Sequence, residues 1–425
     1  MPNFAFYMFK RIIIFLLLIS GLYSYGQEKI VHDLKVQGNK KLKTSFIKSI
    51  STTKSGSKLD TLIIEQDILR LKRLPSVSHA YYQVFPSEDN QYNVFYNIEE
   101  NFTLIPSLNI YTTNNDEFAY RAGLYEFNAL GRNITVGGFY QKDIYSSYAV
   151  NFRAPYLFSN KFGLAINHQD LTTQEPVFFE EETADYKYNN KSLEVLGLYE
   201  INFKNRFELG LNYFTEDYKF KGDNINNRPE LKVHKWLVKG IYEYNNLDYY
   251  YQYISGFRSQ FNFQYVTSNN NMLPDFFIGW NDFFYFKRIG ERGNWANRLR
   301  MGLSTNDNTP FAPFSVDNNL NVRGVGNTID RGTGVIVLNT EYRHTLYEKD
   351  WFVLQGNAFI DSGTWRNPGG DFGDFSKDDN VKVYPGLGFR FIHKKIYNAI
   401  FRIDYGYGIT KDATRGFVFG IGQYF

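Results

Sequence analysis

The chain has no cysteine among its 425 residues. This absence excludes disulfide bonds, thiolate metal sites, a cysteine nucleophile and a lipidated N-terminal cysteine, and it suits a protein that crosses an oxidising compartment. An excess of charge is also missing, since the formal net charge is only +3 and no basic run is present. The sequence therefore does not indicate a phosphate-neutralising surface, and we expect no nucleic-acid partner.

Long apolar segments are almost absent. The mean hydropathy of −0.41 is too low for a bundle of membrane-spanning helices. The one clear apolar run, residues 12–19, follows two basic residues and precedes the small residues Ser24 and Gly26. A bilayer-spanning helix needs about 20 apolar residues, so this run is too short to be one. We predict a signal peptide over residues 1–26, with the mature chain starting near Gln27.

Catalytic patterns are lacking too. The six histidines are scattered, and neither H-E-x-x-H nor G-x-S-x-G occurs. Acidic runs at 180–182 and 378–379 leave a paired-carboxylate glycosidase open, although such charges in polar loops are ordinarily solvated. Residues 371–379 offer oxygen ligands for calcium without the EF-hand spacing. We expect no enzymatic activity, no cofactor and no metal site.

Aromatic residues, in contrast, are abundant. The chain has 34 Tyr and 40 Phe, which bring the aromatic content to 19%, beside 34 Gly and only 12 Pro. This is more than a soluble core requires, and it fits many β-strands whose rings lie at a membrane boundary. An aromatic surface that binds carbohydrate or nucleic acid is the alternative interpretation.

Residues 27–101 are predicted to form a small α+β domain. The predicted elements are a strand at 30–36, helices that begin near 44 and 60, and strands at 79–85 and 92–98. Thr44 or Ser45 would cap the first helix, and Asp60 the second. This β-α-α-β-β order, with Gly38-Asn39 after the first strand and Glu99-Glu100 closing the last, resembles a polypeptide-transport-associated (POTRA) domain. A generic periplasmic adaptor domain is the alternative.

Residues 102–425 show two-residue alternation between polar loops. Phe207, Leu209, Leu211 and Tyr213 alternate with polar or small residues, and residues 257–265 and 295–304 repeat this pattern. A soluble sandwich would alternate as well, but it would not pair an aromatic face with arginine, glutamate and glutamine over such a length. At about 10 residues per membrane strand, the region holds roughly 16 strands. We predict a mainly β fold, a 16-stranded antiparallel transmembrane barrel.

The final strand predicts a common outward face for Phe417, Phe419, Ile421 and Phe425, with Gln423 as the one departure. A chain that ends on an aromatic residue resembles the C-terminal signal by which outer-membrane barrels are delivered for insertion.

Alternation also predicts which side chains of the preceding strands face the lumen. The predicted inward set comprises Asp361, Gly386, Gly388, Arg390, Arg402, Asp404, Gly406 and Gly408. Inward glycines leave room for another segment to pack against the wall.

One loop holds an arginine between apolar and glycine residues, in the stretch Asn321-Val322-Arg323-Gly324-Val325-Gly326-Asn327. A flexible Gly/Asn turn is the simple interpretation. Val322-Arg323-Gly324, however, resembles the V-R-G-aromatic tip of the re-entrant loop in the superfamily of outer-membrane insertases and translocases.

Further motifs carry the same resemblance. Residues 359–363, Phe-Ile-Asp-Ser-Gly, resemble the F-x-D-x-G strand motif of that superfamily, and Gly386-Leu-Gly388-Phe-Arg390 resembles its G-x-G motif. Residues 128–132 and 152–156 resemble patterns near the start of its barrel. Val325 departs from the usual aromatic residue, and one POTRA-like domain departs from the several that members devoted to general barrel assembly usually carry.

The resemblance implies a re-entrant loop near residues 317–334, with Arg323 bound to Asp361 beside Gly363 in the lumen, or to Asp404 as a rival partner. It implies the outer membrane of a Gram-negative bacterium, with the POTRA-like domain in the periplasm. Its implied partners are the lipid bilayer, unfolded β-barrel or secreted polypeptide clients, periplasmic chaperones and accessory lipoproteins. The implied function is to assemble and insert β-barrel proteins or to move polypeptides across the outer membrane, with a translocase dedicated to one cargo or a passive porin as alternatives.

Overall fold

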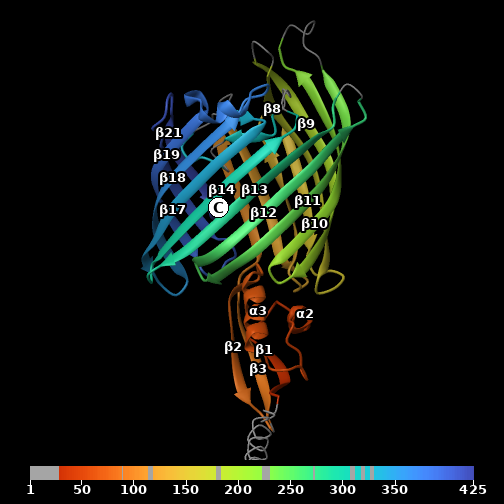
Figure 1. Ribbon diagram of the computed structural model, residues 1–425, viewed down its shortest axis with the longest axis vertical. Helices are drawn as coiled ribbons and strands as arrows, with labels where there is room; N and C mark the ends of the chain where they lie inside the picture. The colour runs from red at the N-terminus through yellow and green to blue at the C-terminus, as the bar shows by residue number, and fades with distance from the viewer. Residues whose placement is uncertain are drawn as a thin grey trace, which may run out of the picture.

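Two β-sheets organise the chain in the computed structural model, a small one below and a large curled one above it (Figure 1). The structure describes residues 28–88, 90–112, 118–178, 183–222, 230–270, 273–306, 312–316, 321–325 and 330–425. The predicted signal peptide and the acidic run at 180–182 lie outside the described residues. No described helix is both long and apolar enough to cross a membrane.

The small sheet belongs to an N-terminal α+β unit with the predicted element order. Its elements are β1 (Ile30–Gln37), α2 (Thr44–Ile50), α3 (Thr61–Lys72), β2 (Val77–Pro86) and β3 (Gln91–Glu100). The strand order is β1-β3-β2, with β3 parallel to β1 and antiparallel to β2. Ile64, Ile68 and Leu71 of α3 lie in the apolar core, as their helical spacing predicts.

Of the two predicted helix N-caps, one is correct and the other is wrong. The Asp60 side chain accepts hydrogen bonds from the backbone N–H groups of Leu62 and Ile63, so it caps α3 as predicted. The predicted cap of α2 by Thr44 or Ser45 is wrong, because the N-cap is Lys43 and no side chain caps this helix. A tertiary contact fixes the chain here instead, since the Lys43 N–H donates to the Gly131 carbonyl at 2.9 Å.

The large sheet has 16 strands joined to their neighbours in antiparallel pairs, which confirms the predicted strand number and fold class. Its strands are β4 (Leu104–Thr112), β5 (Phe118–Ala129), β6 (Ile134–Lys142), β7 (Ser146–Ala154), β8 (Phe162–Phe178), β9 (Thr183–Asn202), β10 (Asn205–Phe220), β11 (Leu231–Tyr250), β12 (Tyr253–Ser268), β13 (Phe276–Ile289), β14 (Gly293–Ser304), β17 (Gly334–Glu348), β18 (Phe352–Arg366), β19 (Val381–His393), β20 (Ile400–Tyr407) and β21 (Arg415–Ile421). The hairpin of β15 (Phe314–Val316) and β16 (Asp330–Gly332) and the 3-10 helices η2 (Phe372–Ser376) and η3 (Asp378–Asn380) complete the described elements.

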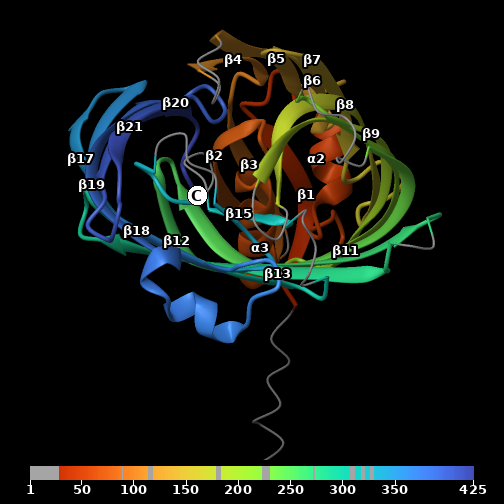
Figure 2. The same cartoon turned by 90° about the horizontal axis from the view of Figure 1, so that it is seen from above.

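The barrel is nearly closed. In the sheet of described residues, β4 pairs with β5 alone and β21 with β20 alone, so the first and last strands are both edges. Seen from above, β4 and β20–β21 lie on the same side of the ring (Figure 2). We call the boundary between β4 and β21 the seam.

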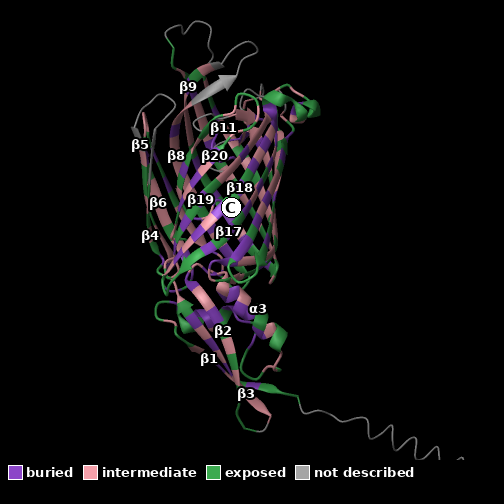
Figure 3. Cartoon of the chain, turned by 90° about the vertical axis from the view of Figure 1, so that its left-hand side faces the viewer, coloured by how far each residue is buried: buried purple, intermediate pink, exposed green. Residues whose placement is uncertain are grey.

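Buried and exposed residues alternate along the barrel strands (Figure 3). In β18, Asn357, Phe359 and Asp361 are buried, whereas Ala358 and Ile360 are exposed. The predicted inward and outward faces of this strand are therefore confirmed.

The end of the chain departs from the predicted common face. Phe417, Phe419 and Ile421 are exposed, but β21 stops at Ile421 and Gly422 takes a φ of 88°. The predicted outward position of Phe425 is wrong, because its ring lies 5.5 Å from the guanidinium of the buried Arg343 and packs against the buried cluster of Leu247, Phe286 and Ala296. A backbone turn at glycine breaks the two-residue period on which the prediction depended.

The N-terminal unit is docked on the turns at one end of the barrel. Arg73, just after α3, donates to the carbonyls of Phe203, Asn245 and Leu247 at 3.0–3.2 Å. Nη2 of Arg70 lies 2.8 Å from Oε1 of the buried Glu200 in β9. These bonds join the C-terminal end of α3 to the β9–β10 hairpin and to β11, so they fix both position and orientation.

His79 is a titratable side chain that contacts the β11–β12 turn at this docking interface. Its ring stacks on Tyr251 of the β11–β12 turn at 4.7 Å between centroids, and it meets Tyr250 edge-on at 5.6 Å. Burial, and next the charge of Lys72, lower the pKa of His79, while the carboxylates of Glu99 and Asp248 oppose this shift. A histidine with a lowered pKa favours the docked state when neutral, so docking weakens as the pH falls through its ordinary value of about 6.5.

We therefore expect weaker docking at about pH 5.5 than at about pH 7.5, as the histidine becomes charged. The distance between a spin label on the N-terminal unit and one on the barrel would measure this change in docking. His79→Phe keeps an aromatic ring that does not titrate, so the label distance in this variant should not change with pH. An unchanged pH profile in this variant would assign the effect to another group.

Candidate functional site

The described part of the arginine loop, residues 321–325, lies inside the barrel beside the β15–β16 hairpin. Figure 2 shows β15 within the ring of strands. Val322 and Arg323 have no exposed surface. Gly326, Asn327 and the remainder of the predicted loop at 317–320 and 328–329 lie outside the described residues.

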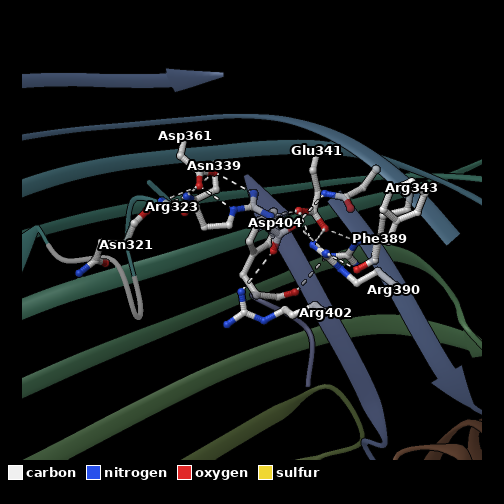
Figure 4. A network of polar contacts seen from close by, with 12 residues as sticks. Asn321, Arg323, Asn339, Glu341, Arg343, Asp361, Phe389, Arg390, Arg402 and Asp404 are labelled. Atoms are coloured by element: carbon white, nitrogen blue, oxygen red, sulfur yellow. Dashed lines mark hydrogen bonds and ion pairs between the residues drawn. The ribbon is translucent and has the colours of Figure 1, made fainter. Parts of the chain in front are cut away.

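Arg323 and Asp361 are in direct contact (Figure 4). Nε of Arg323 donates to Oδ2 at 2.7 Å and Nη2 donates to Oδ1 at 2.9 Å, which is a bidentate ion pair. The backbone N–H of Arg323 donates to Oδ2 as well, at 3.0 Å. The carboxylate thus binds both the side chain and the backbone of the loop.

Two more carboxylates surround the same guanidinium. Nη1 of Arg323 donates to Oε2 of Glu341 at 2.7 Å and lies 3.5 Å from Oδ2 of Asp404. Asp404, predicted as a rival of Asp361, is therefore a more distant neighbour beside it. All four side chains are fully buried.

Strand register explains how these groups meet. Asn339 of β17 is the partner of Asp361 in β18, and its Nδ2 donates to Oδ1 of Asp361 and to the carbonyl of Asn321. Two residues along β17, on the same face, lies Glu341. Neighbouring strands therefore supply the second carboxylate and the amide that orients the first.

Three further arginines complete the group. Arg390 of β19 directly faces Arg402 of β20, an arrangement that destabilises a sheet when the like charges are left unscreened. Asp404 separates them, accepting from Arg390 at 2.7 Å and from Arg402 at 3.3 Å. Glu341 accepts from Arg390 at 3.2 Å and also from Arg343. We call these seven residues the arginine cluster: Arg323, Arg343, Arg390, Arg402, Glu341, Asp361 and Asp404.

Aromatic rings cover the cluster. The Arg323 guanidinium lies 3.7 Å from the ring centroid of Phe359 and 4.5 Å from that of Tyr424. Tyr424 also contacts Arg402, at 4.7 Å. Cation–π attraction strengthens when water is excluded, as it is here. The inward turn after Gly422 therefore brings the last residues of the chain onto the loop arginine.

The predicted glycines have different roles. Gly324 has a φ of 101°, and a Cβ on it would lie 2.8 Å from the backbone of Gly406. A Cβ on Gly363 would come within 3.1 Å of Val322, so Gly363 makes room for the loop. Gly386 instead makes room for Phe359, and Gly388 for Asp404 and Asn357. Of the wall glycines, Gly406 is the one whose added Cβ would strike the loop backbone.

We expect Gly406→Ala to displace the loop, because the new Cβ would lie 2.3 Å from the Arg323 carbonyl oxygen. Overpacking of this kind costs about 1–3 kcal/mol. Gly416→Ala on the adjacent strand is the matched control, since the nearest atom to its Cβ is 4.0 Å away. Thermal unfolding and protease cleavage of the loop should change for Gly406→Ala alone, and equal behaviour of the two variants would contradict the close packing.

Val325, which replaces the expected aromatic residue, is buried in an apolar cluster together with Val322, Val316 and Trp365. The carbonyl of the preceding Gly324 accepts a hydrogen bond from the Thr414 hydroxyl at 3.1 Å. A small apolar side chain thus suffices to seat this end of the described loop.

Sequence reasoning did not identify Glu341, Arg343, Asn339 or Tyr424. The first three have a readable signal, since they alternate with outward residues along β17 in the same way as the residues of β18. Tyr424 has no such signal, because it follows the turn at Gly422.

The arginine cluster is suited to holding a loop. Its four guanidinium groups and three carboxylates make direct ion pairs with one another. Among the described residues, no group of three or more His, Cys, Asp or Glu side chains is placed to hold a metal ion.

Comparison with known proteins gives fold relatives but no sequence relatives. No model of a known protein family matches the chain, and no curated protein matches it by sequence. Among solved structures, CdiB from Escherichia coli has a TM-score of 0.62 at 13% identity, covering 92% of this chain and 75% of that chain. CdiB from Acinetobacter baumannii has a TM-score of 0.59 at 14% identity, covering 93% and 74%.

BamA from Haemophilus ducreyi lacking POTRA domains 1-3 has a TM-score of 0.54 at 15% identity, covering 93% of this chain and 84% of that chain. The chain therefore shares its fold with BamA and CdiB.

Proposed function

We propose that this protein is an outer-membrane insertase or translocase that acts on polypeptide clients, in a Gram-negative bacterium. The fold shared with BamA and CdiB supports this proposal. So does the outer surface of the barrel, where large apolar side chains such as Leu211, Phe261, Leu387 and Phe389 are exposed. Such a surface needs lipid around it.

Between the two activities we favour insertion of β-barrel proteins, and the edges at the seam are the observation that carries this choice. Both β4 and β21 have a side without a ladder partner in the described sheet. An unpaired edge is a template for a further strand, so a client strand would add to it by β-augmentation. No covalent chemistry is needed, and we propose that the protein is not an enzyme.

The N-terminal unit would stand in the periplasm and capture unfolded clients. Its edge strand β2 pairs on one side only among the described residues, whereas the start of β1 is bonded on its outer side to residues 56–59. Periplasmic chaperones and accessory lipoproteins would deliver clients to this unit. The arginine cluster would hold the loop in place while the seam opens.

The alternative is a translocase dedicated to one cargo, in which an extended polypeptide passes through the lumen. The loop and the β15–β16 hairpin occupy part of that path. A translocase would therefore have to displace them.

Site-specific photocrosslinking in living cells would distinguish the two activities. Crosslinkers at Leu108 of β4 and Phe419 of β21 report clients at the seam, whereas crosslinkers at luminal Arg300 and Arg258 report clients in transit. We expect adducts with many barrel proteins at the seam positions. Adducts with one secreted cargo at the luminal positions would favour the translocase, and conductance without client adducts would favour a passive porin.

Depletion of the protein, followed by proteomics of the outer membrane and the medium, provides an independent test. General loss of barrel proteins supports the insertase. Loss of a single secreted cargo supports the translocase instead.

A further inference from the structure

The two ends of the seam are held differently. Along the described strands the seam has no ladder, yet the segment that leads into β4 is hydrogen-bonded across it. The N–H of Phe102 donates to the Lys395 carbonyl at 2.8 Å, and the N–H of Tyr397 donates to the Phe102 carbonyl at 3.0 Å. Lys395 and Tyr397 both belong to the turn between β19 and β20.

These bonds bypass the last strand. At this end β21 stops at Ile421, and Gly422 turns away with its N–H bonded to the Ile400 carbonyl at 2.8 Å. Beyond the end of β21, Phe102 therefore pairs directly with the β19–β20 turn and forms a parallel bridge with Ile396. The ring of strands is closed at the end next to the N-terminal unit by this contact.

Side chains reinforce the contact from both directions. The ring of Tyr397 packs against Phe127 of β5 at 4.7 Å between centroids. The Lys41 ammonium group of the N-terminal unit lies 5.1 Å from the Phe102 ring. Asn101 is anchored in turn, because its N–H donates to the Ser76 carbonyl at 2.9 Å. The contact therefore links β4, β5, the β19–β20 turn and the N-terminal unit.

We propose that Phe102 and the turn at residues 394–399 form a strap that fixes this end of the seam and makes it the pivot about which the seam opens. Opening would then begin at the far end, where no ladder joins the described residues of β4 and β21. The claim that the opened seam admits a client strand rests on the proposed function. The strap itself does not rest on it.

Spin-label distances test the strap without any client. Because the chain has no cysteine, introduced cysteines are the only labelled sites. One label pair at Leu104 and Ile421 reports the strapped end, and a second pair at Leu108 and Phe417 reports a position further from it. We expect a narrow distance distribution for the first pair and a broader one for the second. Equal breadth at the two positions would overturn the proposal.

Paired variants at Tyr397 isolate the backbone bond. Tyr397→Pro removes the N–H donor and the ring, whereas Tyr397→Ala removes the ring alone. We expect the narrow distribution at 104 and 421 to be lost only in the proline variant, with the heat-modifiable electrophoretic shift showing that the barrel is folded. An unchanged distribution in a folded proline variant would refute the strap. If this variant does not fold, Phe102→Pro compared with Phe102→Ala tests the other bond in the same way.

Disulfide locking tests the pivot in client insertion. A Phe102→Cys, Ile396→Cys lock should leave insertion intact, whereas a Leu108→Cys, Phe417→Cys lock should abolish it until reduction. Loss of insertion in the first lock would overturn the pivot. Full insertion in both locks would reject the seam as the site of insertion, and the label distances would still decide the strap.

Discussion

Replacing Arg323 with alanine should destabilise the folded barrel by about 3–5 kcal/mol, the usual cost of removing one partner of a buried ion pair. The reason is geometric. Asp361 loses both side-chain bonds of a bidentate pair, Glu341 loses a 2.7 Å bond, and neither carboxylate has exposed surface from which to recover water. Phe359 and Tyr424 lose the guanidinium group that they cover.

Arg300→Ala is a matched control. Arg300 also pairs with a luminal aspartate, Asp282, at 2.7 Å, but about a quarter of its side chain remains exposed. Asp282 keeps Arg298 as a partner at 3.0 Å when Arg300 is removed, so no buried carboxylate is left unpaired and the cost should be much smaller. Denaturant unfolding and protease protection of the loop would compare the two variants. Equal losses would show that burial of the arginine cluster contributes nothing special.

Arg323→Lys should recover only a small part of the stability. Lysine keeps the charge but has no planar fork, so it cannot bind Asp361 in bidentate fashion while also bonding Glu341. Wild-type loop protection in this variant would mean that charge alone seats the loop.

Replacing Glu200 with alanine should weaken the docking of the N-terminal unit on the barrel by about 1.5–3 kcal/mol, because Arg70 keeps Asp67 at 3.0 Å but loses its ion pair to the barrel. Glu200 accepts from Arg70 of α3 at 2.8 Å and from the Tyr156 hydroxyl at 3.0 Å, and it lies 3.4 Å from Nη2 of Arg206. Without it, two arginine side chains at the interface lose a carboxylate partner.

Glu194→Ala provides the control for this experiment. Glu194 lies on the same face of β9 and is similarly buried, but its partners Lys239, at 2.7 Å, and Asn167, at 2.9 Å, belong to the barrel. Limited proteolysis between the two units, together with label distances, should show undocking for Glu200→Ala alone. Undocking in both variants would point to general loosening of the barrel wall.

The sequence alone was sufficient for most features whose determinant is local, the cap of α2 being an exception. A two-residue period decides which side of a strand faces the lumen, so Asp361, Arg390, Arg402 and Asp404 were predicted inward and are buried. The helix cap at Asp60 and the number of strands follow from equally local patterns. The contact of Arg323 with Asp361 was predicted only through a resemblance to known motifs.

Tertiary structure decided the features that depend on strand register, on turns and on contacts between distant segments. Glu341 became a partner of Arg323 because the register of β17 against β18 places it beside Phe359. Phe425 turned inward because one glycine ended the alternation. The pairing of Arg70 with Glu200 and of Phe102 with Lys395 joins residues far apart in the chain. The period of a strand specifies a face, and only the closed arrangement of all the strands specifies which faces meet.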